Sequence, residues 1–159
     1  MKYRTVESEE VHVVGLKTEA SFVNISQITP QLARQFMPRL NEVKNRKDLF
    51  TLSLQNYSHF DFKNFNPNDT FEKWIGVEVT NLDTVPKDMQ TLSIVSGRYL
   101  VIDFKGSIPD FIELWQKIHS SWLPSSEFEL DNRPHFERLP QSYNPMQAVN
   151  EEEIWIPIK

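Results

Sequence analysis

The sequence predicts an α+β fold in which one strand-helix-strand-strand unit occurs twice, over about residues 8–80 and about residues 96–159. Each unit opens with strand-like alternation, continues with a proline-marked amphipathic helix, and ends with two more alternating segments. Two copies of one module usually pack about a pseudo-twofold axis. We therefore expect a single domain over residues 1–159, with antiparallel sheets, helices on one face and a ligand groove on the other.

Four elements are expected in the first unit, in the order strand, helix, strand and strand, at Val11–Thr18, Thr29–Lys44, Leu49–Asn56 and Trp74–Thr80. Thr29 is a candidate N-cap, and Pro30 would then stand in the first turn, where a missing N–H costs nothing. Pro38 lies inside the helical pattern and should kink or split the helix. The apolar face of the helix recurs at Leu32, Phe36, Leu40 and Val43.

The second unit repeats this order at Arg98–Phe104, Ile108–Trp122, His135–Leu139 and Glu153–Ile158. Ser107 is the expected cap of its helix, Pro109 follows closely, and Pro124 should end it. The helix carries an apolar stripe, which is typical of a face packed on a sheet, at Phe111, Leu114, Trp115, Ile118 and Trp122.

Alternation along the strands divides their side chains between two faces. In the last strand the three isoleucines share one face, which should pack against the helices, and Trp155 lies on the other. By the same argument Trp74 and Gly76 lie on the face away from the helices. Large aromatic side chains on that face require a second layer, a partner or a ligand.

A loop at residues 56–72 mixes polar turn residues with four phenylalanines, Phe60, Phe62, Phe65 and Phe71. So many aromatic side chains in a loop should bury something. The loop is either a lid over the groove or a segment fixed to the edge of the core, and the second alternative is slightly favoured.

Composition narrows the function. The 159 residues with 12% aromatics favour one folded soluble domain. The net charge of −5, without a basic cluster, argues against nucleic acid as a main partner. The absence of cysteine excludes disulfides and fits a reducing compartment. Neither a signal peptide nor a long apolar run is visible, so the cytoplasm is expected and a membrane partner is not.

Cofactor and metal sites are not indicated. The four histidines, His12, His59, His119 and His135, lack metal-ligand spacing, and four glycines in the whole chain leave no phosphate-binding loop. His135 shares a strand face with Glu137, and such an acid–histidine pair could perform general acid–base chemistry. A single strand often produces this arrangement by chance.

One ordered set of short motifs resembles a known family. The motifs are Gly76-Val77-Glu78-Val79, Val85-Pro86, Ser96 to Val101, Lys105-Gly106, Trp115, Trp122-Leu123-Pro124, Phe136-Glu137-Arg138 and Glu153 to Ile158. In this order the chain resembles the GyrI-like effector-binding domain, which is attached to many AraC-type and some MerR-type bacterial regulators and also occurs alone. The resemblance implies two repeats forming a groove for small, often cationic and lipophilic, compounds.

The resemblance also implies a set of site residues. Glu137 matches the buried acid that neutralises cationic ligands in the family, and Trp74 and Tyr99 match aromatic positions near the groove. Trp155 and Tyr57 are further expected ligand-binding residues. Leu139 stands where the family commonly has tyrosine, which removes a polar group and leaves hydrophobic binding intact.

Physical chemistry supports this role for Glu137. A carboxylate between apolar neighbours loses hydration, which raises its pKa unless a cation compensates. A lipophilic cation would do so, and each well-placed aromatic face would add about 0.5–2 kcal/mol. The alternative is an exposed glutamate paired with Arg138 or Arg133, worth roughly 0–1 kcal/mol. Glu153 is a second candidate acid, or part of a solvated turn.

Three functions remain open. The first is a stand-alone protein that senses or sequesters a lipophilic, cationic compound without contacting DNA itself. The second is a hydrolase of strained electrophilic compounds with Glu137 as the general base, which the change to Leu139 disfavours. The third is an interaction protein, with a separate regulator or DNA gyrase as its partner.

Overall fold

In a computed structural model that describes residues 1–159, eight strands form one antiparallel sheet, and two main helices lie against it. The α+β class is confirmed. The strands are β1 (Tyr3–Ser8), β2 (Val11–Ser21), β3 (Thr51–Asn56), β4 (Thr70–Val79), β5 (Gln90–Ile94), β6 (Gly97–Gly106), β7 (His135–Leu139) and β8 (Asn150–Ile158). The helices are α1 (Ile25–Phe36) and α2 (Ile108–Lys117), extended by η1 (Met37–Glu42), η2 (Ile118–Trp122) and α3 (Leu123–Ser125).

The strand order β1-β6-β8-β7-β3-β4-β2-β5 contains the repeated unit. β2-α1-β3-β4 and β6-α2-β7-β8 occupy mirrored positions in this order, and the two units meet where β3 pairs with β7. The strand before each unit joins the other one, because β1 pairs with β6 and β5 pairs with β2. The two units therefore form one continuous sheet, with a seam between β3 and β7.

The expected N-cap is confirmed for the helix of the second unit and is wrong for the helix of the first. Ser107 caps α2, accepting a hydrogen bond from the Asp110 N–H while the Asp110 carboxylate accepts one from Ser107 N, as in a capping box. α1 instead begins at Ile25, so Thr29 is not its cap and Pro30 lies inside the helix. The expected split at Pro38 is confirmed, since a 3₁₀ turn starts at Met37.

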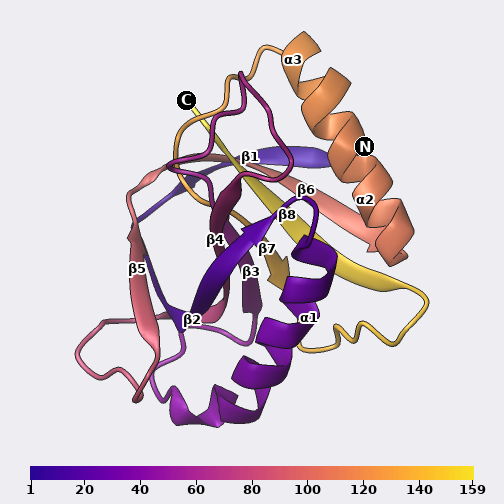
Figure 1. The fold of residues 1–159 in the computed structure, drawn as a ribbon. Coiled ribbons are helices and arrows are strands. Elements are labelled where there is room, and N and C mark those ends of the chain that lie inside the picture. Colours follow the sequence, from indigo (N-terminus) through magenta and orange to yellow (C-terminus); the bar gives the residue numbers. More distant parts are fainter.

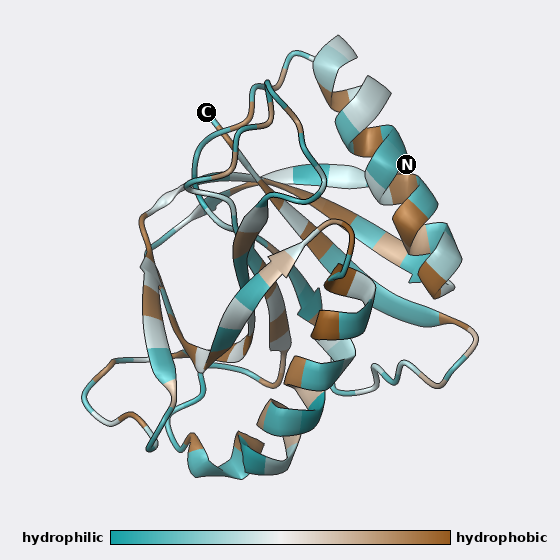
Figure 2. Ribbon diagram, viewed as in Figure 1, coloured by the Kyte–Doolittle hydropathy of each residue, from teal (hydrophilic) through white to brown (hydrophobic).

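Both helices cover the same face of the sheet (Figure 1). α1 packs on a cluster that includes Val14, Ile75 and Val77, and α2 with η2 packs on a cluster that includes Leu100 and Ile154. Bands of opposite hydropathy alternate along the strands and around the helices, as a two-sided sheet requires (Figure 2). Ile154, Ile156 and Ile158 all join the α2 cluster, as their spacing predicted.

The face away from the helices is closed by a core of its own. Trp74, Leu54, Phe136, Trp155 and Val101 form a row across five paired strands on this face. The sheet curls so that this row also packs against both ends of the strand order, and all eight strands contribute to the cluster through Val6, Val11, Val13, Leu52, Leu92, Ile94 and Tyr99. The interior of the curl is therefore packed with side chains.

Candidate functional site

The strand register separates the predicted site residues between the two faces of the sheet. Trp74, Tyr99 and Trp155 belong to the cluster on the face away from the helices. Glu137 pairs across the ladder with Ser53 and Ile154, and Ile154 belongs to the helix-covered core. The expectation that these four residues line one groove on the face away from the helices is therefore wrong. Alternation along a strand shows which residues of that strand share a face. It does not relate the faces of different strands, and Glu137 was assigned to the groove only by the family resemblance.

The three aromatic residues on the far face serve as core. Trp74 is 1% exposed and Tyr99 is fully buried. Their polar atoms are satisfied locally, because Trp74 Nε1 donates to Glu72 Oε1 at 3.1 Å and the Tyr99 hydroxyl donates to the Pro134 carbonyl at 2.8 Å. Trp155 stacks on Phe136 with ring centroids 5.3 Å apart. Trp74 and Tyr99 are therefore core side chains, and Trp155 packs against this core while remaining partly buried.

Polar side chains gather instead on the helix-covered face at the seam between the two units. We call this group the seam cluster, and its members are Ser53, Gln55, Lys73, His135, Glu137 and Glu152. Five of the six are buried, and Glu152 is half-buried. Gln55 Nε2 donates to Glu137 Oε1 at 3.5 Å, and Lys73 Nζ donates to Ser53 Oγ at 2.6 Å. Such a concentration of buried polar groups is costly for folding, which is typical of a functional site.

Burial perturbs every ionisable member of the seam cluster. Desolvation raises the pKa of Glu137 to about 7, although Lys73 and the Gln55 amide oppose the rise. Desolvation and the charge of Glu137 raise the pKa of Glu152 to about 8. The pKa of Lys73 falls to about 8 because its ammonium is desolvated, against the attraction of the two carboxylates. Desolvation also lowers the pKa of His135 well below its usual value, so its imidazole is neutral.

An aromatic wall stands beside the seam cluster. We use this name for Phe22, Tyr57, Phe60, Phe71 and Trp115. The Phe22 ring lies 5.4 Å from Trp115 on α2 and 5.1 Å from Phe71 on β4, so the wall bridges the two units. Tyr57 packs 4.9 Å from the His135 ring, and burial with the nearby Glu137 charge raises its pKa. Tyr57 is thus the one predicted aromatic site residue that the fold places near Glu137.

The phenylalanine-rich loop supplies part of this wall. Phe60 and Phe71 are buried in the same cluster as Tyr57, so this part of the loop is fixed to the core edge, as the favoured alternative held. Phe62 and Phe65 remain 40% and 54% exposed. In Figure 1 the loop between β3 and β4 lies on the side of α2, in agreement with the Phe22–Trp115 and Phe22–Phe65 contacts.

Two histidines connect the wall to the seam cluster. The His119 ring on η2 lies 4.3 Å from Trp115 and 5.8 Å from His135. The buried His119 Nε2 and His135 Nδ1 atoms have no hydrogen-bond partner. Unpaired buried polar atoms cost free energy, and a ligand that offered a hydrogen bond would recover it. No group of three side chains here could hold a metal ion.

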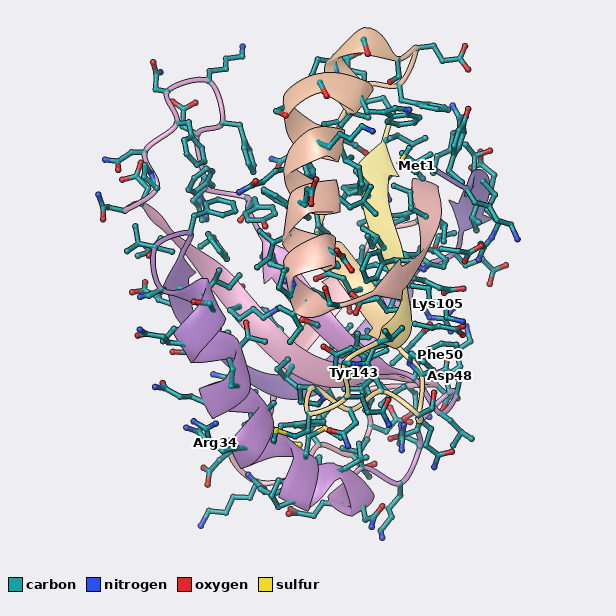
Figure 3. All side chains as sticks on the ribbon, turned by 90° about the vertical axis from the view of Figure 1, so that its right-hand side faces the viewer. Met1, Arg34, Asp48, Phe50, Lys105 and Tyr143 are labelled. Carbon is teal, nitrogen blue, oxygen red and sulfur yellow. The ribbon has the colours of Figure 1, made fainter.

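The seam cluster reaches the surface at Glu152. This residue lines an open hollow of about 380 Å³, together with Phe104, Arg138 and Pro140. Figure 3, which views the molecule from the helix side, shows Tyr143 on the loop before β8. Burial, and then the charges of Glu152 and Glu137, raise the pKa of Tyr143.

The other candidate positions have different roles. Leu139 lies two residues after Glu137 on the same strand and is half-buried. Glu137 is not a surface ion-pair partner, because Arg138 binds Asp48 and Glu153, and Arg133 binds Asp131. Glu153 is held on the opposite face of the sheet from Glu137.

Some of the missed residues carried a readable signal. Phe71, Lys73, Ile75, Val77 and Val79 alternate along β4, and Lys73 is the one charged position in an otherwise apolar series that faces the helices. An unbroken alternation would have predicted a buried lysine. Phe22 and Trp115 meet only through the tertiary fold, and no local pattern reveals that contact.

Together these features define a class of protein: an α+β domain of two fused units with a buried acid and an aromatic wall at their junction, suited to a small apolar molecule with a polar or charged group. The whole chain, residues 1–159, matches the family described as GyrI-like small molecule binding domain. The chain therefore belongs to the GyrI-like small-molecule-binding family.

Individual relatives are distant. The chain is 26% identical over 162 residues to the transcriptional regulator BrlR of Pseudomonas aeruginosa, covering 99% of this chain and 56% of BrlR. It thus spans just over half the length of that curated relative. A putative transcription regulation protein from Staphylococcus aureus MU50 has a TM-score of 0.70 at 18% identity, covering 100% of this chain and 99% of that one. SAV2435 bound to tetraphenylphosphonium has a TM-score of 0.70 at 19% identity, covering 100% and 94%. These two structures agree with the fold.

No helix of the chain is long and apolar enough to cross a membrane.

Proposed function

We propose that this chain binds a small lipophilic cation on the helix-covered side of the sheet, with Glu137 as counter-charge and the aromatic wall as apolar contact. The observation that carries the proposal is the burial of the Glu137 carboxyl at 8% exposure with only one hydrogen-bond donor, Gln55, at 3.5 Å. A buried carboxylate so weakly satisfied gains much from an added cation. The cytoplasm remains the proposed location.

The aromatic wall supports the same ligand class. The Tyr57 ring lies 4.9 Å from the ring of His135, a member of the seam cluster, and the Trp115 ring lies 4.3 Å from that of His119. Cation–π attraction contributes about 0.5–2 kcal/mol for each well-placed ring. SAV2435, which shares the fold, was solved with tetraphenylphosphonium, a lipophilic cation. That compound is therefore the natural first probe for this chain.

The test is a thermal-shift titration with tetraphenylphosphonium and with triphenylphosphine oxide, a neutral compound in which an oxygen replaces the fourth phenyl ring. The cation should stabilise the wild type, and Glu137→Gln should weaken its binding by about tenfold or more while changing binding of the neutral compound little. Glu153→Gln is the matched control, because this acid lies on the opposite face. Equal weakening of both compounds in Glu137→Gln would refute the charge role.

One observation keeps a hydrolase as a second candidate. A carboxyl whose pKa is about 7 can act as a general base at neutral pH. Single-turnover assays with strained electrophiles, compared between the wild type and Glu137→Gln, separate this activity from binding. Turnover that persists in the variant would exclude Glu137 as the base. Absence of both binding and turnover would favour the third alternative, a protein partner such as a regulator or gyrase.

A further inference from the structure

Lys73 is the most deeply buried charged side chain of the seam cluster. It is 1% exposed, and its single hydrogen bond goes to the Ser53 hydroxyl at 2.6 Å. The lysine ion pairs of the chain all lie elsewhere, at Lys17, Lys47, Lys105 and Lys159. An ammonium buried without a directly bound carboxylate is costly, so its placement requires an electrostatic reason.

That reason lies in the register of the sheet. Ser53, which accepts the Lys73 hydrogen bond, stands directly opposite Glu137 across the β3–β7 pair. Gln55, two residues further along β3, stands opposite Lys73 and donates a hydrogen bond to the Glu137 carboxylate. The ammonium and the carboxylate therefore flank the same short stretch of β3. At low effective dielectric, charges held this close interact strongly even without contact.

The cluster therefore holds two acids and one internal base. Glu137 and Glu152 contribute the carboxyls, and the charge of the Lys73 ammonium opposes the rise of the pKa of both. Arg138 and Arg4 do not serve this purpose, since both pair with Glu153 on the other face of the sheet. Without a ligand, Lys73 balances the charge that a bound cation would otherwise balance.

We infer that Lys73 is the resident counter-ion of Glu137 and that a cationic ligand must take over this role, so that Lys73 sets the charge selectivity of the site. This inference rests on the proposed function. A cation entering beside Glu137 meets the repulsion of the Lys73 ammonium until that group moves away or releases its proton to solvent. A neutral ligand of the same shape meets no such repulsion.

A first experiment needs no ligand. Lys73 is observed by ¹³Cε chemical shift during a pH titration of the whole chain. It should titrate near pH 8, far below the exposed lysines, and Glu137→Gln should lower its pKa further, because the variant removes the attracting carboxylate. The other titratable groups of the surroundings are His135, Glu152, Tyr57, Tyr143 and His119.

Glu152→Gln repeats this test from the second acid if Glu137→Gln does not fold. An unchanged Lys73 pKa in the folded variant would overturn the counter-ion assignment. A purely structural lysine, held by packing and by Ser53 alone, would give that result.

A second experiment measures selectivity. Lys73→Met keeps most of the length of the unbranched side chain and removes the charge. It should raise affinity for tetraphenylphosphonium by about tenfold and leave triphenylphosphine oxide within about twofold. Lys17→Met is the matched control, since Lys17 is a partly exposed lysine on the neighbouring strand β2, paired with Glu72.

The outcomes separate the two claims. Equal changes for both compounds in Lys73→Met, or a loss of cation affinity, would overturn the selectivity role and leave the proposed function standing. If tetraphenylphosphonium binds neither the wild type nor the two lysine variants, the proposed function is overturned, and with it the selectivity role of Lys73.

Discussion

Glu137 and Lys73 are a buried acid and a buried base that lie close to each other in the seam cluster. Both side chains lie on the helix-covered face of the sheet, and the second acid of the seam cluster, Glu152, lies on the same face. A cluster of this kind weakens the fold and strengthens binding, because the charges are balanced fully only when a ligand is present. These buried ionisable residues therefore predict that the free energy of unfolding depends strongly on pH.

Stability should fall as the pH rises from about 4.5 to about 8. Over this interval the unfolded chain ionises Glu137 and Glu152, whose folded pKa values are about 7 and about 8, so the folded state holds more protons. Lys73 acts in the opposite direction only above about pH 8. Glu137→Gln should remove its share of the decline, on the order of 1–3 kcal/mol.

Urea unfolding near pH 5 and near pH 7.5, for the wild type and the variant, measures this difference. A decline of the same size in both proteins would show that the Glu137 carboxyl is not desolvated in the fold.

The strands illustrate what local sequence could and could not predict. Alternation placed the three isoleucines of β8 and the aromatic Trp74 and Trp155 on the correct faces. Alternation could not show whether Glu137 on β7 shares a face with those aromatics. That depends on the register between strands far apart in the chain, which the whole sheet determines. Sequence alternation therefore could not show that Glu137 lies on the face opposite those aromatics, nor that Phe22 contacts Trp115.

Gly76 provides a prediction for an individual element. It stands opposite Gly15 in the β2–β4 pair, and a Cβ on Gly76 would lie 2.6 Å from the Val14 carbonyl oxygen. This glycine allows the close approach of strands β2 and β4. Gly76→Ala should lower the free energy of unfolding by about 1–3 kcal/mol through overpacking.

Chemical denaturation of Gly76→Ala gives this value directly. Loss of ligand affinity in a variant of unchanged stability would instead show that Gly76 borders a binding site.

At the scale of the whole molecule, the β3–β7 pair joins the two units into one continuous sheet. The exchanged strands β1 and β5 form its two edges and help to close its inner face. The helix-covered face then offers the junction between α1 and α2, where the seam cluster and the aromatic wall meet. The duplicated order of elements was readable from the sequence. The curl that fills the other face was not, because it results from packing between strands at opposite ends of the sheet.

The most direct test of this arrangement uses the four tryptophans, which lie on known sides of the sheet. The indole N–H resonances are followed by two-dimensional NMR during a titration with tetraphenylphosphonium, after assignment by single Trp→Phe variants. The structure predicts that the Trp115 resonance shifts strongly while those of Trp74 and Trp155 stay in place. Shifts at Trp74 and Trp155 with an unmoved Trp115 would contradict a site on the helix-covered face.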